Sequence, residues 1–131
     1  MNVLRISATG QINALEKLLP ENALLLDGEK VRSSEELELA ELLAKDAFAK
    51  RSNMARRFRY EFLLWLAGKT DIKSALASFG ASQPADMLLV VFGGEASAVA
   101  KKLDADKKQL NLEKTAEPLA LERISLGRIK N

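Results

Sequence analysis

Two residue types that carry out much of enzyme chemistry are missing from this chain, which contains no cysteine and no histidine. Without cysteine there is no disulfide framework and no thiolate nucleophile. Without histidine the chain lacks the side chain that most often acts as a general base or binds transition metals near neutral pH. We therefore expect a protein that is not an enzyme and has no metal or other cofactor, although carboxylates and lysine could still serve catalysis.

Long apolar segments are also missing. No apolar run is longer than residues 87–92, which are far fewer than the roughly 20 residues that a membrane-spanning helix needs. The N-terminal segment does not combine positive charge with an apolar stretch, so we expect no secretory signal. Together with the absence of cysteine, these features favour the cytoplasm and a protein that does not contact membranes.

The 131 residues are enough for one domain that buries its own core. Apolar spacing predicts strands at residues 3–8, 23–26, 87–92 and 110–112. It predicts helices at residues 12–19, 33–48, 53–67, 71–79, 95–103 and 117–129. Because strands and helices do not alternate strictly, we expect an α+β (mixed α/β) fold: a single sheet of about four strands covered by helices, in one domain spanning residues 1–131.

Two helix ends carry clear sequence signals. Ser33 and Glu36 have the spacing of a capping box, in which each side chain accepts a hydrogen bond from the other residue's backbone N–H. Gly80 is placed to end the preceding helix in a left-handed conformation.

The most informative segment is residues 50–60, which contain five cations and no acidic residue. Ser52 or Asn53 is a good N-cap, so we expect a helix whose first two turns carry Arg56, Arg57 and Arg59. The N-terminus of a helix is already positive, and a helix start loaded with cations favours an anionic ligand.

Tyr60 is expected to project between Arg56 and Arg57, one turn further along the helix. An aromatic ring beside guanidinium groups suits a phosphate backbone with an unstacked base, which is how single-stranded nucleic acid is usually held. The alternative is a solvated basic face in which Arg57 pairs with Glu61. The candidate nucleic-acid site comprises Lys50, Arg51, Arg56, Arg57, Arg59 and Tyr60.

Two other patterns are weaker. Gly93 and Gly94 follow a predicted strand as in phosphate-binding loops, but no Lys-Ser/Thr pair follows and Glu95 would place a carboxylate at the phosphate position. Asp104 and Asp106 lack the glycine and the bidentate glutamate of a calcium loop. We interpret both segments as ordinary turns.

The C-terminal segment is apolar on more than one side. If it is helical, Leu121, Ile124 and Arg128 share one side, whereas Leu119 and Leu126 lie on another. A short helix of this kind either lies in the core or presents one side to a partner protein. Periodicity alone leaves these two alternatives open.

With these residues identified, the sequence resembles the smallest-subunit family of the KEOPS/EKC complex, an archaeal and eukaryotic family that includes the kinase-binding protein TPRKB. The resemblance covers most of the chain and is strongest over residues 53–82, where Asp71-Ile72, Ala75-Leu76 and Phe79-Gly80 match the family's DI..AL..FG pattern. Residues 25–37, the strand at 87–92 and the closing ERISLGRIK of 122–130 support it. The chain is shorter than many relatives between residues 103 and 118.

The resemblance implies a non-catalytic adaptor in the complex that makes threonylcarbamoyl adenosine in tRNA. Such a subunit binds the small atypical kinase/ATPase of the complex directly, supports its activity, contacts the other KEOPS subunits indirectly and helps recruit tRNA through its 3′ CCA tail. On this basis we expect the basic segment to bind tRNA and Leu121, Ile124 and Arg128 to bind the kinase. The alternative is a stand-alone RNA- or anion-binding domain without a complex.

Overall fold

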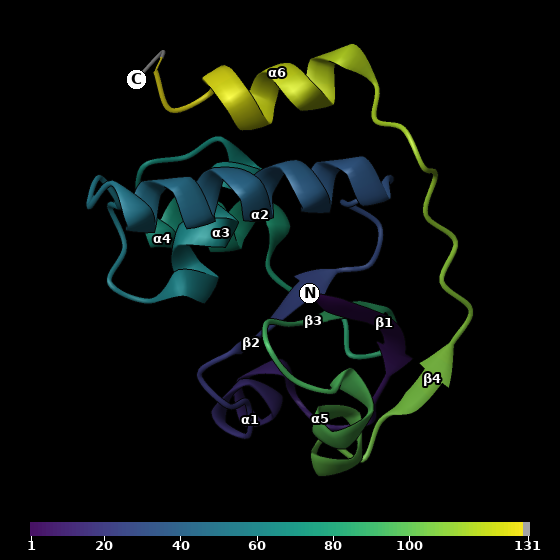
Figure 1. The fold of residues 1–131 in the computed structure, drawn as a ribbon. Coiled ribbons are helices and arrows are strands. Elements are labelled where there is room, and N and C mark those ends of the chain that lie inside the picture. Colours follow the sequence, from purple (N-terminus) through teal and green to yellow (C-terminus); the bar gives the residue numbers. More distant parts are fainter. Residues whose placement is uncertain (130–131) are drawn as a thin grey trace. The chain divides into compact units, whose positions relative to one another are not determined.

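The structure, a computed structural model, describes residues 1–129 (Figure 1). The described chain contains β1 (Asn2–Ser7), α1 (Ile12–Lys17), β2 (Ala23–Asp27), α2 (Ser34–Ala49), α3 (Phe58–Ala67), α4 (Ile72–Phe79), β3 (Met87–Val91), α5 (Ala96–Lys102), β4 (Asp106–Lys108) and α6 (Pro118–Leu126). No helix within residues 1–129 is both long and apolar enough to cross a bilayer.

The chain divides into two compact units. The sheet unit comprises Met1–Lys30 and Gly80–Asn111, and the helical unit comprises Val31–Phe79 with the described part of Leu112–Asn131. The fold class is α+β, as predicted, with one four-stranded antiparallel sheet. The prediction of one domain over residues 1–131 stays a prediction.

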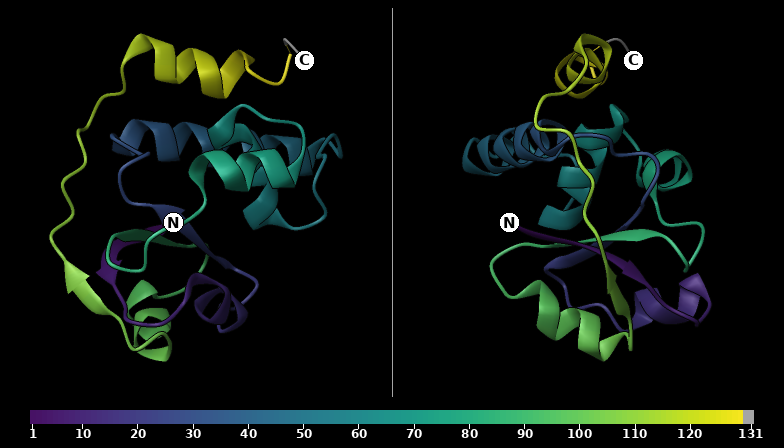
Figure 2. Two further views of the ribbon diagram at one scale, coloured as in Figure 1. Left: turned by 180° about the vertical axis from the view of Figure 1, so that it is seen from behind. Right: turned by 90° about the vertical axis from the view of Figure 1, so that its right-hand side faces the viewer.

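The sheet has the strand order β2-β3-β1-β4. One of its faces is packed by α1 and α5, which lie on the same side of the strands (Figures 1 and 2). The buried cluster on this face consists of Ile6, Leu15, Ala23, Leu25, Met87, Leu89, Val91, Ala96, Val99, Ala100 and Leu103. The alternate residues of β2 and β3, which are Leu24, Leu26, Leu88 and Val90, are buried as well. Burial on both faces explains why β2 and β3 are continuous apolar runs.

The fourth strand was predicted in the wrong place. Apolar spacing pointed to Leu110 and Leu112, but β4 consists of three exposed residues that pair with β1, ending at Lys108. Its two lysines lie on the sheet edge, where charge discourages pairing with other chains. The conformation of Gly80 was also predicted wrongly. Its φ angle is not positive, and the residue forms an isolated β-bridge with Leu26.

An ion pair links β1 to the residue before β3. Arg5 donates from Nε to Oδ1 of Asp86 and from Nη2 to Oδ2, both at 2.8 Å. The side-chain hydrogen bond from Arg5 is the main reason that the pKa of Asp86 lies below its ordinary value, and burial opposes it. The two-point geometry also fixes how the guanidinium lies across the strands.

The helical unit is built from α2, α3, α4 and α6. Its N-terminal helix starts with the predicted capping box, since Ser33 Oγ accepts from Glu36 N and Glu36 accepts from Ser33 N. The helix predicted at residues 33–48 from apolar spacing is confirmed, and its apolar residues face inward: Leu37, Ala40, Ala44 and Ala47 are buried, and Leu43 and Phe48 are partly buried. The segment before α6 runs beside the start of α2, where Ser34 N donates to Glu113 O and Glu35 N donates to Lys114 O.

The backbones of α3 and α6 approach each other closely at two glycines. Gly68 ends α3 in a left-handed conformation with φ 66°, and a Cβ there would meet the carbonyl oxygen of Arg123. A Cβ on Gly127 would lie 2.8 Å from Gly68 Cα. Side chains at either position would therefore push the two helix ends apart.

The Arg5–Asp86 pair predicts a pH-dependent stability. Because folding lowers the pKa of Asp86 from 3.8, the pair contributes its full stabilisation above that value and loses it as pH falls through the lower folded pKa. We expect Asp86→Asn to be destabilised relative to wild type above about pH 5. Urea unfolding should show this difference shrink below about pH 4. A difference in unfolding free energy that stays constant down to about pH 2 would contradict this role.

Candidate nucleic-acid interface

The predicted cationic helix start is instead a loop. Between α2 and α3, residues 50–57 form what we call the basic loop, and α3 begins only at Phe58 with Arg57 as its N-cap. Neither Ser52 nor Asn53 caps a helix: the Asn53 side chain donates to Ala55 O at 2.9 Å. The expectation that Arg56 and Arg57 lie in the first helical turns is therefore wrong.

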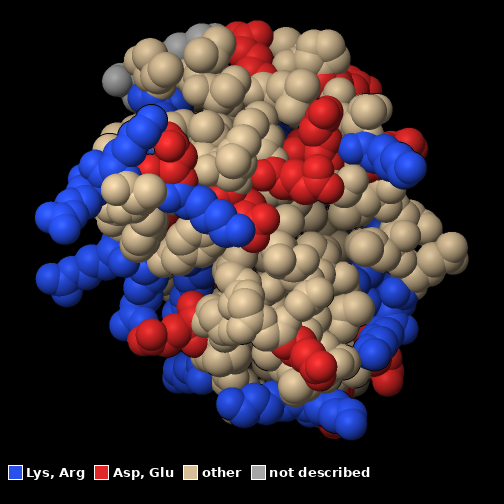
Figure 3. All heavy atoms as spheres, viewed as in Figure 1, with Lys and Arg blue, Asp and Glu red and all other residues tan. Residues whose placement is uncertain are grey.

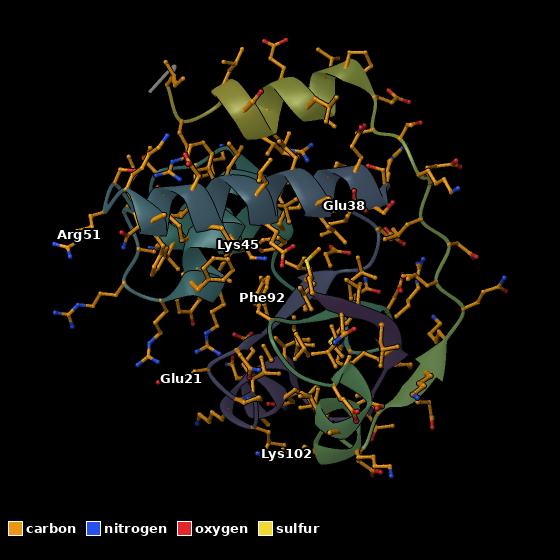
Figure 4. All side chains as sticks on the ribbon, viewed as in Figure 1. Glu21, Glu38, Lys45, Arg51, Phe92 and Lys102 are labelled. Carbon is orange, nitrogen blue, oxygen red and sulfur yellow. The ribbon has the colours of Figure 1, made fainter. Side chains whose placement is uncertain are left out.

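The basic loop presents its cations to solvent. Lys50, Arg51, Arg56 and Arg57 are all exposed. Figure 3 shows lysine and arginine side chains projecting at the left edge of that view, and Figure 4 shows Arg51 pointing away from the ribbon there. Lys50 Nζ lies 3.2 Å from Asp46 Oδ2, and because this ion pair is exposed it contributes little to the stability of the fold. The loop is thus a strongly positive stretch of surface.

The two remaining predicted RNA-binding residues lie in the first turn of α3. Arg59 and Tyr60 are only partly exposed, and the guanidinium carbon of Arg59 lies 4.9 Å from the centre of the Tyr60 ring. The expected arrangement, with Tyr60 between Arg56 and Arg57, is replaced by this cation–π contact. In the loop itself, the exposed apolar side chain is Met54, at 58% exposure.

A buried carboxylate holds the loop in place. Glu61 is 0% exposed, and its Oε1 accepts from Met54 N at 2.8 Å and from Ala55 N at 2.9 Å. Its Oε2 accepts from Trp65 Nε1 at 3.0 Å and from Arg128 Nη1 at 2.9 Å. The chain at residues 54–55 turns toward this carboxylate, which explains why the helix does not begin earlier.

The side of α6 that was expected to face a kinase packs inside the helical unit. Ile124 is 0% exposed, Arg128 is 8% exposed and Leu121 is partly buried. The core alternative therefore describes Ile124 and Arg128, and the expectation that these two contact a partner is wrong. A different set of side chains on and just after α6 is exposed: Leu119 at 77%, Leu126 at 44% and Ile129 at 73%. Lys130, the last residue of the closing motif, lies outside the described residues.

A second ion pair, which is partly buried and involves Arg123 of α6, was not predicted. Arg123 Nη2 donates to Glu36 Oε1 at 2.7 Å, and its Nε donates to Leu66 O at 2.9 Å. The same guanidinium lies over the Phe79 ring, 4.7 Å from its centre. The sequence signal for these pairs was an isolated glutamate in an apolar helix, most clearly Glu61 within FRYEFLLWLA, which needs a partner when the helix is buried.

Other chemistry is sparse in the described part of the chain. Residues 1–129 contain no group of three or more acidic side chains arranged to hold a metal ion. An open hollow of about 270 Å³ in the sheet unit is lined by residues that include Asn2, Glu95 and Lys107. The turn after β3 packs internally, because Asn2 Nδ2 donates to Gly94 O.

Comparison with known proteins gives no functional assignment, so a proposal for function has to rest on the surface and contacts described above. No protein-family model matches the chain, and no curated protein matches it.

Burial of Ile124 leads to a direct test of the core interpretation. Ile124→Glu forces a carboxylate into the interior, and we expect it to destabilise the protein by more than about 4 kcal/mol. Leu119→Glu places the same charge on the same helix at an exposed position, so it should change stability by less than about 0.5 kcal/mol. Thermal unfolding followed by circular dichroism compares the two. Similar melting temperatures for both variants would show that Ile124 is not part of the core.

Proposed function

We propose that this protein is a non-catalytic adaptor that binds RNA through the basic loop, with the 3′ CCA tail of tRNA as the ligand. The observation that carries the proposal is the loop itself: four exposed cations, no acidic residue and an exposed Met54 in one short segment. The resemblance to the KEOPS smallest subunits suggests the setting, the complex that makes threonylcarbamoyl adenosine in tRNA, and the cytoplasm as its place.

The loop's chemistry supports a single-stranded nucleic acid. Cations spaced along one segment can follow a phosphate backbone, which supplies most of the affinity in such complexes. Met54 offers an apolar contact for an unstacked base, and the partly exposed ring of Tyr60 offers a second. Arg56 and Arg57 are adjacent, so they can reach neighbouring phosphates.

An adaptor also needs a surface for a protein partner. Leu119, Leu126 and Ile129 form an exposed apolar set on and just after α6, and we propose that the kinase/ATPase docks there. The other KEOPS subunits would then associate through the kinase. The second candidate is a stand-alone RNA-binding domain. The basic loop supports it, but it does not explain the exposed apolar set.

RNA binding through the loop makes a charge-specific prediction. Arg56→Glu combined with Arg57→Glu should lower affinity for tRNA by more than about tenfold, because two phosphate contacts become repulsive. Lys101→Glu combined with Lys102→Glu makes the same charge change on exposed residues of α5 and should have a much smaller effect. Fluorescence anisotropy at several salt concentrations measures both.

The ligand itself provides the control for that experiment. A tRNA without its CCA end should bind the wild-type protein more weakly, because the loop would lose the single strand. An equal loss of tRNA affinity in the two double mutants would show that binding depends on the net charge of the protein and not on the basic loop. Equal affinity for the two tRNAs would move the contact to the tRNA body.

Kinase docking predicts a different set of sensitive residues. Leu119→Glu with Leu126→Glu should abolish co-elution with the KEOPS kinase while the melting temperature stays near that of wild type, since both side chains are exposed. Leu42→Glu, at a residue of α2 that is 64% exposed, is the matched control and should not affect co-elution. Size-exclusion chromatography checks both variants. Undiminished co-elution of the double mutant would place the kinase contact on another surface, and no co-elution of the wild-type protein would favour the stand-alone candidate.

A further inference from the structure

Glu61 connects two parts of the helical unit that lie far apart in the sequence. One of its oxygens accepts the backbone N–H groups of Met54 and Ala55 in the basic loop. The other accepts from Arg128, which follows α6 and is 67 positions away from Glu61. The same carboxylate thus holds the loop's backbone and the end of the C-terminal segment.

We propose that Glu61 is the positioning residue of the basic loop and that Arg128 controls the order of this loop through Glu61. RNA binding at the loop is then coupled to the docking of α6, although Arg128 does not touch the RNA. This inference rests on the proposed function for its RNA readout, whereas the coupling between Arg128 and the loop's backbone can be measured without RNA.

Arg128 is suited to this role because it supplies the counter-charge. The side chains of Glu61 and Arg128 are 0% and 5% exposed, so neither charge is solvated. The guanidinium also lies against the Trp65 ring, 3.9 Å from its centre, which fixes its orientation. Without Arg128, Glu61 becomes a buried charge that lacks compensation. The carboxylate then has to move toward water, and this movement weakens its hold on the two loop N–H groups.

The pair between Arg123 of α6 and Glu36 provides a comparison within the same C-terminal segment. Glu36 is 2% exposed, and Arg123 reaches it at 2.7 Å. The other donors to Glu36 are the backbone N–H of Arg32 and the backbone and side chain of Ser33, all at the start of α2. Loss of Arg123 therefore loosens α6, but it removes no hydrogen-bond partner from Glu61, which accepts the N–H groups of the basic loop.

Preorganisation is the physical link to RNA affinity. A loop whose backbone is already held loses less conformational freedom when a ligand binds. Arg56 follows directly after the anchored residues 54–55, so release of these two N–H groups lets the exposed cations sample more positions. By linkage, RNA bound to the loop should in turn make displacement of α6 less favourable.

The test compares Arg128→Met with Arg123→Met in the full chain, at a temperature well below both unfolding transitions. We expect amide exchange at Met54 and Ala55 to be at least about tenfold faster in Arg128→Met than in Arg123→Met. RNA affinity should fall about three- to tenfold in Arg128→Met and stay near wild type in Arg123→Met. Arg128→Lys keeps the charge and should restore part of both properties. If Arg128→Met does not fold, Arg128→Lys is compared with Arg123→Lys in the same way.

The outcomes separate this inference from the proposed function. Equal exchange at residues 54–55 in the two methionine variants would overturn the coupling, whatever the RNA affinities are. Fast exchange in Arg128→Met together with no RNA binding by the wild-type protein would support the coupling and refute the proposed function. Fast exchange with unchanged RNA affinity would confine Arg128 to a structural role and overturn its control of binding.

Discussion

The helical unit depends on two buried glutamates that α6 and the residues after it neutralise. Glu36 and Glu61 would each be costly inside an apolar interior, and Arg123 and Arg128 make their burial tolerable. Each guanidinium also lies against an aromatic ring, Phe79 or Trp65, so the pairs are oriented as well as neutralised. The polar network specifies where α6 lies, and Ile124 adds apolar burial between the two arginines.

This arrangement explains which parts of the sequence could be interpreted in advance. The capping box at Ser33, the end of the helix predicted at residues 53–67 and the apolar spacing of residues 33–48 are local signals, and the structure confirms them. The start of α3 was missed because its determinant is not local: Glu61 draws the N–H groups of Met54 and Ala55 away from a helical path. Helix capping is predicted from the few residues around Ser52 and Asn53. The carboxylate that sets the backbone path here is Glu61, which lies inside the helix.

The candidate site was predicted with the same mixture of success and error. A run of cations without acids identified an exposed basic segment, because charge runs lie at the surface. The orientation of α6 could not be read from periodicity, since both sides of that helix carry large apolar residues. The burial of Arg128 was hidden for a further reason: arginine is usually solvated, and only its distant partner Glu61 makes an interior position favourable.

The five-residue spacing between Arg123 and Arg128 has a consequence for chain length. One residue inserted between them would rotate the second arginine by about 100° relative to the first if the helical path continued, so both pairs could not form together. Because Gly68 and Gly127 are already in close contact, the backbone after Arg123 cannot shift to accommodate an added residue. The exposed stretch at residues 109–111 precedes the segment that pairs with the start of α2, and it can lengthen without disturbing either arginine. Natural length variation in proteins built this way should therefore collect before residue 112 and be absent between Arg123 and Arg128.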